Sequence, residues 1–177
     1  MIDILSERLI LRLVPLAGLA AMAARDVDAC RRLIGNVPDA WFDESWVAEL
    51  RLGQWKADPD YAPWSIRTIA RRLDGEIAGY MNCHDKPVVF EHRGEVGLMI
   101  EMGYTIFEPH RRQGIATEAI EAFTDFAARE GVRWVRLSIA PGNAASLALA
   151  ERFGAVKIGT QYDDRDGPED VYLFDLD

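Results

Sequence analysis

The 177-residue chain contains few of the residues that build metal sites and disulfide frameworks. It has two cysteines, Cys30 and Cys83, and three histidines. The only local grouping, Cys83-His84-Asp85, consists of consecutive residues, whose side chains alternate across a strand and cannot converge on one ion. We therefore predict no metal site, and reduced thiols of the kind found in cytoplasmic proteins.

Basic residues and long apolar runs are also scarce. Lys and Arg number 20 against 29 Asp and Glu, which gives a formal net charge of −9. Such a chain lacks the basic surface that neutralises nucleic-acid phosphates or anionic membranes. The apolar run 13–24 follows Arg8 and Arg12 but is broken by Pro15, and no run reaches the ~20 residues of a membrane helix. We expect a cytoplasmic protein without a nucleic-acid or membrane partner.

The residue pattern predicts one α/β domain over residues 1–177 with a mixed sheet, because 49% of the residues are hydrophobic and no linker or repeat appears. Period-2 alternation predicts strands at 7–14, 64–71, 76–84, 95–107, 133–140, 156–162 and 171–174. Apolar spacing and capping signals predict helices at 16–24, 30–34, 43–54, 115–130 and 144–153, with a loop at 58–63. The order strand 95–107, helix, strand 133–140 implies a crossover between parallel strands.

The run R-R-Q-G-I-A at 111–116 lies between a predicted strand and a predicted helix. Unpaired amides and partial positive charge at a helix N-terminus favour phosphate, and Gly114 and Ala116 leave room for it. Arg111 and Arg112 add charged donors. The alternative is an ordinary helix start with two solvated arginines. Neither a P-loop nor a G-x-G-x-x-G motif is present, so a nucleoside triphosphate or dinucleotide is not expected.

Three segments together carry a family resemblance. R-x-x-G-x-A at 111–116 resembles the pyrophosphate loop of the GNAT family of acetyl-CoA-dependent N-acetyltransferases. P-G-N-A-A-S at 141–146 with E-R-F-G at 151–154 resembles a segment of its RimJ/RimL-like branch, which acetylates ribosomal-protein N-termini, and E-R-L-I-L-R at 7–12 resembles that branch's opening strand. The resemblance implies a GNAT-like acyl-CoA N-acyltransferase fold with a splayed central sheet, acetyl-CoA as co-substrate and a primary amine as acceptor.

The resemblance also implies site residues. Glu101, the only carboxylate in the apolar run 96–107, is the expected base or water relay, and partial burial would raise its pKa; a solvated Glu on a strand edge is the alternative. Ala150 stands where a tyrosine often acts as general acid, so Ser146 is expected to assist the departing thiolate. Asn143 either binds the cofactor or only caps a helix. The implied cofactor-binding residues are Tyr104, Thr105, Ile106, Arg111, Arg112, Gln113, Gly114, Ile115, Ala116, Thr117, Asn143 and Ser146.

The acceptor is expected to be a protein or peptide N-terminus, because an α-amine loses its proton far more readily than lysine. A small polyamine or aminoglycoside is the alternative within the class, and a noncatalytic acyl-CoA-binding regulatory module is the rival outside it. The resemblance places acceptor specificity at 26–54 and 163–170. The acidic loop 163–170 either attracts a cation or only faces water. Four aromatic residues either line an acceptor groove or form core: Trp41, Phe42, Trp46 and Trp55. The oligomeric state, including a homodimer, stays open.

Overall fold

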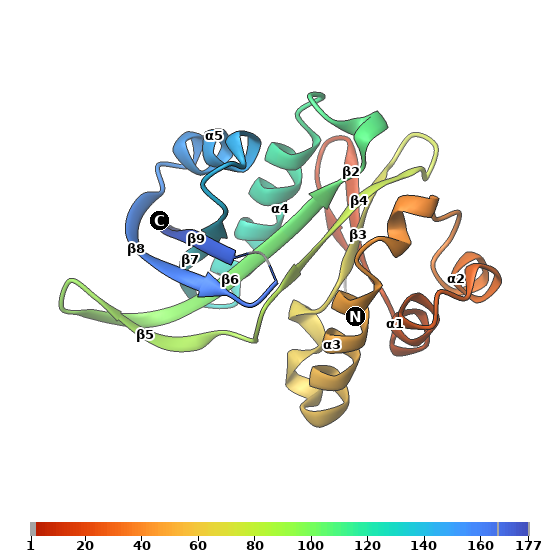
Figure 1. The fold of residues 1–177 in the computed structure, drawn as a ribbon, viewed down its shortest axis with the longest axis horizontal. Coiled ribbons are helices and arrows are strands. Elements are labelled where there is room, and N and C mark those ends of the chain that lie inside the picture. The colour runs from red at the N-terminus through yellow and green to blue at the C-terminus, as the bar shows by residue number, and fades with distance from the viewer. Residues whose placement is uncertain (1–2, 166, 177) are drawn as a thin grey trace. The chain divides into compact units, whose positions relative to one another are not determined.

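The computed structural model describes residues 3–165 and 167–176, and its elements fall into two units that interleave along the chain. The first unit contains the residues up to Lys86 together with Tyr104–Phe123. The second contains Pro87–Gly103 and the residues from Thr124 onward. Strand β6 (Glu95–Ile106) and helix α4 (Ile115–Arg129) each supply residues to both units, so neither unit is a continuous segment of chain (Figure 1).

The sheet of the first unit has the strand order β1-β2-β3-β4-β6. Its other strands are β1 (Ile4–Leu5), β2 (Leu9–Leu13), β3 (Arg67–Arg71) and β4 (Ile77–Cys83). Leu9, Leu11 and Leu13 are buried at alternate positions, as the sequence pattern predicts. All residues of β4 are buried, which indicates a strand covered on both faces. The turn between β3 and β4 contains Gly75 at a φ of 75°.

Besides the 3-10 helix η3 (Glu108–His110) and the first part of α4, the helices of the first unit come from the N-terminal part of the chain, drawn in red to yellow in Figure 1. They are α1 (Leu16–Ala23), α2 (Val27–Leu33) and α3 (Ser45–Ala57), with 3-10 helices η1 (Asp39–Phe42) and η2 (Pro59–Trp64). Helix α1 packs against α2 and α3. The loop expected at 58–63 is wrong: the Asp58 carboxylate accepts from the amide of Asp60 at 3.0 Å, and its capping begins η2.

The second unit contains the parallel strand pair of the predicted crossover. Its elements besides β6 are β5 (Val88–His92), β7 (Val132–Ile139), α5 (Ala144–Arg152), β8 (Val156–Asp163) and β9 (Gly167–Asp175). Strands β6 and β7 are parallel, with Glu101 opposite Arg136, while β7 pairs antiparallel with β9. Strand β5, which the sequence pattern did not indicate, pairs with β6. The expected acidic loop is shorter than 163–170, because β8 reaches Asp163 and β9 starts at Gly167; Asp166 lies outside the described residues.

Both thiols belong to the core. Cys30 and Cys83 are buried and form no disulfide. Burial raises the pKa of both thiols above the usual range, so neither is an activated nucleophile. Over residues 3–165 and 167–176, no group of His, Cys, Asp and Glu could hold a metal ion. Within the same ranges, every helix is too short or too polar to cross a membrane.

Gly79 allows β4 to lie beside β6, and its replacement gives a first prediction. A Cβ at this position would lie 2.1 Å from the carbonyl oxygen of Thr105, a backbone atom with little freedom to move. We expect Gly79→Ala to lower the free energy of unfolding by about 3 kcal/mol, measured by urea denaturation. Gly53→Ala is the matched control: the added methyl meets nothing within 4 Å, and α3 should gain about 0.5–1 kcal/mol. Equal stabilities for wild type and Gly79→Ala would contradict this account.

Candidate functional site

The chain enters α4 through a turn with two left-handed residues. Arg112 has a φ of 60° and Gly114 a φ of 75°. The first helical hydrogen bond runs from the amide of Glu118 to the carbonyl of Gly114 at 3.1 Å. The amides of residues 115–117 therefore precede the helical ladder and have no partner within it. Free amides at a helix start are a geometry that can bind an anion.

The polar side chains of this turn have different roles. Arg111 donates from Nε to the carbonyl of Ile106 at 2.9 Å and so ties the turn to the end of β6. Gln113 donates from Nε2 to the carbonyl of Pro109 at 2.9 Å. Arg112 is exposed to solvent. Arg111 and Gln113 thus shape the turn through these bonds, and Arg111 and Arg112 are both exposed to solvent.

A pair that the sequence analysis missed holds the turn in place. Arg8 donates from Nε to Glu118 Oε2 at 2.6 Å and from a terminal nitrogen to the carbonyl of Gln113 at 3.1 Å. Glu118 also accepts from the Ser6 hydroxyl at 2.7 Å and from the Arg8 amide at 2.6 Å. Burial alone would raise the pKa of Glu118, but these hydrogen bonds outweigh it and hold the pKa below its usual range. No local pattern links two residues 110 positions apart.

The segment 104–106, expected to bind the cofactor through its backbone, is half-buried at the end of β6 and pairs with β4. The Thr105 hydroxyl donates to Glu44 Oε2 at 3.2 Å, and the Tyr80 hydroxyl donates to the same oxygen. Glu44 precedes α3 at its N-cap position, yet its side chain makes no capping hydrogen bond. Glu44 is thus a carboxylate in contact with the predicted site residue Thr105. The sequence analysis did not single out Glu44.

Glu101 lies in the second unit, among polar partners. Its side chain is 16% exposed, which agrees with the partial burial expected from its apolar run. It accepts a hydrogen bond from the Ser138 hydroxyl at 2.6 Å, and Arg136 Nε lies 3.3 Å from its other oxygen. Both partners stabilise the ionised carboxylate. The apolar run 96–107 predicts the partial burial of Glu101 but not its partners. Strand β7 supplies these partners, the cation of Arg136 and the hydroxyl of Ser138.

The contacts of Glu101 continue across the sheet of the second unit. Arg136 on β7 donates to the side-chain oxygen of Gln161 on β8. Gln161 donates from Nε2 to Glu169 on β9 at 2.9 Å. The four strands together hold the Glu101 carboxylate in one orientation, which a residue acting on a bound molecule requires.

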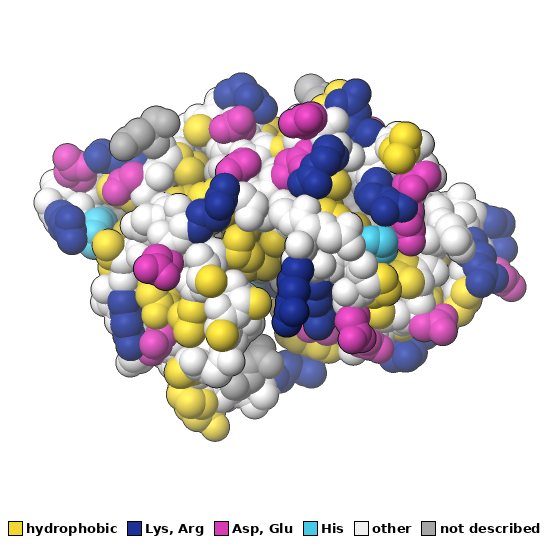
Figure 2. All heavy atoms as spheres, turned by 90° about the horizontal axis from the view of Figure 1, so that it is seen from above, with side chains coloured by type: hydrophobic (Ala, Val, Ile, Leu, Met, Phe, Trp, Pro, Cys, Tyr) yellow, Lys and Arg dark blue, Asp and Glu magenta, His cyan; other side chains and the backbone are white. Residues whose placement is uncertain are grey.

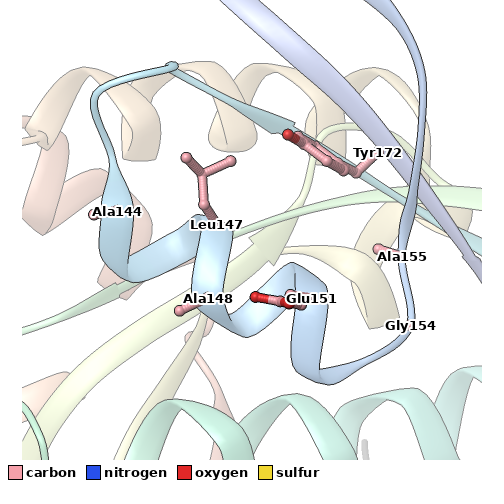
Figure 3. A pocket seen from close by; sticks show the side chains of 7 residues that line it. All are labelled: Ala144, Leu147, Ala148, Glu151, Gly154, Ala155 and Tyr172. Carbon is pink, nitrogen blue, oxygen red and sulfur yellow. The ribbon is translucent and has the colours of Figure 1, made fainter.

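Asn143 and Ser146 open α5, as predicted. Asn143 Oδ1 accepts from the Ser146 amide at 3.1 Å, so the side chain caps the helix. Asn143 is exposed and Ser146 half-buried, while Ala150, where a tyrosine was expected by analogy, is fully buried. A hollow lies between α5 and β9, with Ala155 on its wall (Figure 3). The residues lining it are Ala144, Leu147, Ala148, Glu151, Gly154, Ala155 and Tyr172.

The two units divide the predicted site residues. The first contains 104–106 and the turn 111–117, and the second contains Glu101, Asn143 and Ser146. Three of the four candidate groove aromatics are core residues, with at most 7% exposure, and Trp46 is half-buried. On the face shown in Figure 2, acidic and basic side chains occur in mixed groups.

Comparison with known proteins identifies the class. The model of the acetyltransferase (GNAT) domain matches residues 8–156, and the chain therefore belongs to this family. It is a GNAT-family acetyltransferase, an enzyme that uses an acyl-CoA donor, and its mixed α/β fold is the fold of that family. No significant match is found among curated proteins.

Solved structures share this fold at low sequence identity. An acetyltransferase from Agrobacterium tumefaciens is 22% identical with a TM-score of 0.64, covering 98% of this chain and 94% of its own. A ribosomal-protein-S5-alanine acetyltransferase from Vibrio fischeri is 16% identical with a TM-score of 0.65, covering 100% and 98%. RimJ of Mycobacterium smegmatis in complex with CoA-disulfide is 18% identical with a TM-score of 0.59, covering 94% and 81%.

The Arg8–Glu118 pair predicts a pH-dependent stability. Glu118→Gln should lower the free energy of unfolding by about 1–2 kcal/mol at pH 7, because charged hydrogen bonds to a mostly buried carboxylate are lost. The folded-state pKa of Glu118 lies below its unfolded value of about 4.3, so its contribution is present above that pH and disappears as the pH falls through the folded pKa.

Urea denaturation of wild type and Glu118→Gln at pH 7 and pH 3 measures this difference, which should shrink at the lower pH. Asp125→Asn, an exposed change on the same helix, is the control and should have no comparable effect. A difference that stays constant between the two pH values would show that the ion pair contributes nothing.

Proposed function

We propose that this enzyme transfers an acetyl group from acetyl-CoA to a primary amine, with a protein or peptide N-terminus as the first choice of acceptor. The observation that carries the donor assignment is the turn before α4, whose amides at 115–117 have no helical partner. The whole chain, 1–177, acts as one acetyltransferase domain of the RimJ/RimL-like branch. Its site of action is the cytoplasm.

We assign the cofactor contacts separately in each unit. In the first, the amides of residues 115–117 hold the pyrophosphate, and Arg112 adds a charged donor from solvent. The backbone of residues 104–106 holds the acetyl-bearing arm. In the second unit, the exposed Asn143 side chain, which caps α5, is the proposed cofactor contact. Arg111 acts through the backbone of Ile106 and shapes the turn.

Direct attack by the amine on the thioester carbonyl needs no enzyme nucleophile. The amine must lose its proton, and we assign this step to Glu101, directly or through one water. Arg136 and Ser138 orient its carboxylate. Ser146 donates a hydrogen bond to the departing thiolate, and the proton comes from solvent, because no tyrosine stands at position 150.

The acceptor assignment rests on proton chemistry and on fold. An α-amine with a pKa near 7.7–8.0 is roughly 10–20% neutral at pH 7, whereas lysine is below about 0.1%. A carboxylate paired with an arginine is a weak base. An α-amine has a lower pKa than lysine, so a weak base deprotonates it more easily. The structural likeness to a ribosomal-protein-S5-alanine acetyltransferase supports the same choice. A polyamine or aminoglycoside is the second acceptor class.

The buried Ala150 favours one different function, a regulatory module that binds acyl-CoA without turnover. Thiol release from acetyl-CoA separates the two, with a panel of peptides bearing free N-termini, polyamines and aminoglycosides. We expect release with a peptide N-terminus. Tight acetyl-CoA binding without release on any amine would leave the binding module as the better assignment.

Replacing Glu101 tests the proposed base. Glu101→Gln keeps the shape and the contact with Ser138 but removes the proton acceptor, so we expect kcat to fall by about 10²–10⁴-fold with little change in acetyl-CoA affinity. Initial rates between pH 6 and pH 9 give the measurement. Glu95→Gln is the matched control on the same strand, because Glu95 is exposed and paired with Arg133. Full activity of Glu101→Gln across this range would refute the assignment.

A further inference from the structure

We propose that Glu44 is the acceptor-binding carboxylate of this enzyme and that its ligand is a positively charged amino group. The proposal rests on the proposed acetyl transfer and names the chemistry that selects the acceptor. All the residues that carry it lie in the first unit: Trp41, Glu44, Tyr80, Thr105 and Phe107.

The Glu44 side chain does not cap helix α3, although Glu44 has the N-cap position of that helix. A polar residue before a helix usually accepts hydrogen bonds from the first amides of that helix. Glu44 has the N-cap position of α3 but makes no such bond. Its side chain turns away to Tyr80 on β4 and Thr105 on β6, where both hydroxyls donate to Oε2.

The carboxylate lacks a positive partner. Within residues 3–165 and 167–176, the partners of Glu44 are these two hydroxyl groups, and no Lys, Arg or His forms an ion pair with it. The residue is half-buried, so water compensates its charge only in part. Glu101 and Glu118, in contrast, each have an arginine partner. Glu44 is thus a carboxylate whose ion pair with a bound cation is favourable in free energy.

The surroundings of Glu44 strengthen such an ion pair. The Tyr80 ring packs edge-on against the buried Trp41, with centroids 5.6 Å apart, and lies 6.2 Å from the Phe107 ring. An apolar wall lowers the local dielectric constant and increases the attraction between opposite charges. Burial, followed by the charge of Glu44, raises the pKa of Tyr80, so its hydroxyl stays protonated and donates to the carboxylate.

The location fits an acceptor. Thr105, which contacts Glu44, belongs to the segment 104–106 proposed to hold the acetyl-bearing arm. A cationic amine at Glu44 is therefore held beside the strand that carries the donor. A peptide N-terminus and a polyamine share this ammonium chemistry, and both serve as probes.

Binding to the full-length enzyme saturated with CoA tests the assignment by calorimetry. The probes are a lysine-free hexapeptide amide with a free alanine N-terminus, the same peptide with its N-terminus acetylated, and spermidine. We expect the free peptide or spermidine to bind wild type, and Glu44→Gln to weaken that binding roughly tenfold or more. The acetylated peptide should bind both proteins equally weakly. The probe that depends on Glu44 identifies the source of the amine.

Two variants separate recognition from folding. Glu49→Gln removes an exposed carboxylate from the same helix and should bind the probes like wild type. Tyr80→Phe removes one donor but keeps the carboxylate, so its binding should stay within about threefold of wild type. Unchanged binding by Glu44→Gln, equal losses in Glu44→Gln and Tyr80→Phe, or no binding of either cationic probe to wild type would overturn the proposal.

The two proposals fail in different ways. Loss of probe binding in Glu44→Gln without CoA release on any amine would support the Glu44 site and refute acetyl transfer. CoA release with an unchanged KM for the amine in Glu44→Gln would support acetyl transfer and refute the Glu44 site. Thermal unfolding and CoA affinity of Glu44→Gln, both expected at wild-type values, show that the variant is folded.

Discussion

The functional turn depends on one ion pair, the contact between Arg8 and Glu118. It joins the residue just before β2, near the start of the chain, to the first turn of α4. A terminal nitrogen of the same Arg8 guanidinium donates to the carbonyl of Gln113. An anion site made of backbone amides works only if the amides already point the right way, because reorienting them on binding would consume the binding energy. Pairing also neutralises Glu118, whose charge would otherwise oppose an anion at the same helix end.

Three carboxylates in this chain show how surroundings assign different roles to the same chemical group. Glu118 is held by an arginine and a hydroxyl and serves the fold. Glu101 has a similar pair of partners on β7, but it lies in the strand where the proposed chemistry takes place. Glu44 has hydroxyl partners and no cation among the described residues. A paired carboxylate is stabilised and oriented, whereas an unpaired one in partly apolar surroundings favours a cationic ligand.

The family assignment and the substrate assignment have different foundations. The matching domain model and the shared fold establish a GNAT acetyltransferase. The same fold serves many acceptors, so the amine is decided by particular side chains. Of the four aromatic residues for which an acceptor groove and the core were the alternatives, three are core residues. On the face shown in Figure 2, acidic and basic side chains are mixed, although the net charge is −9.

The sequence by itself determined most of the elements and the turn before α4, although it missed β5 and η2, because helix starts, alternating strands and the R-x-x-G-x-A segment depend on neighbouring residues. Strands β6 and β7, helix α4, the Asn143 cap and the partial burial of Glu101 were predicted in this way. The tertiary structure alone decided which side chains meet: Arg8 with Glu118, Arg136 and Ser138 with Glu101, Tyr80 and Thr105 with Glu44. These partners are 35 or more positions apart in the chain. Their contacts follow from strand order and register, which no local pattern encodes.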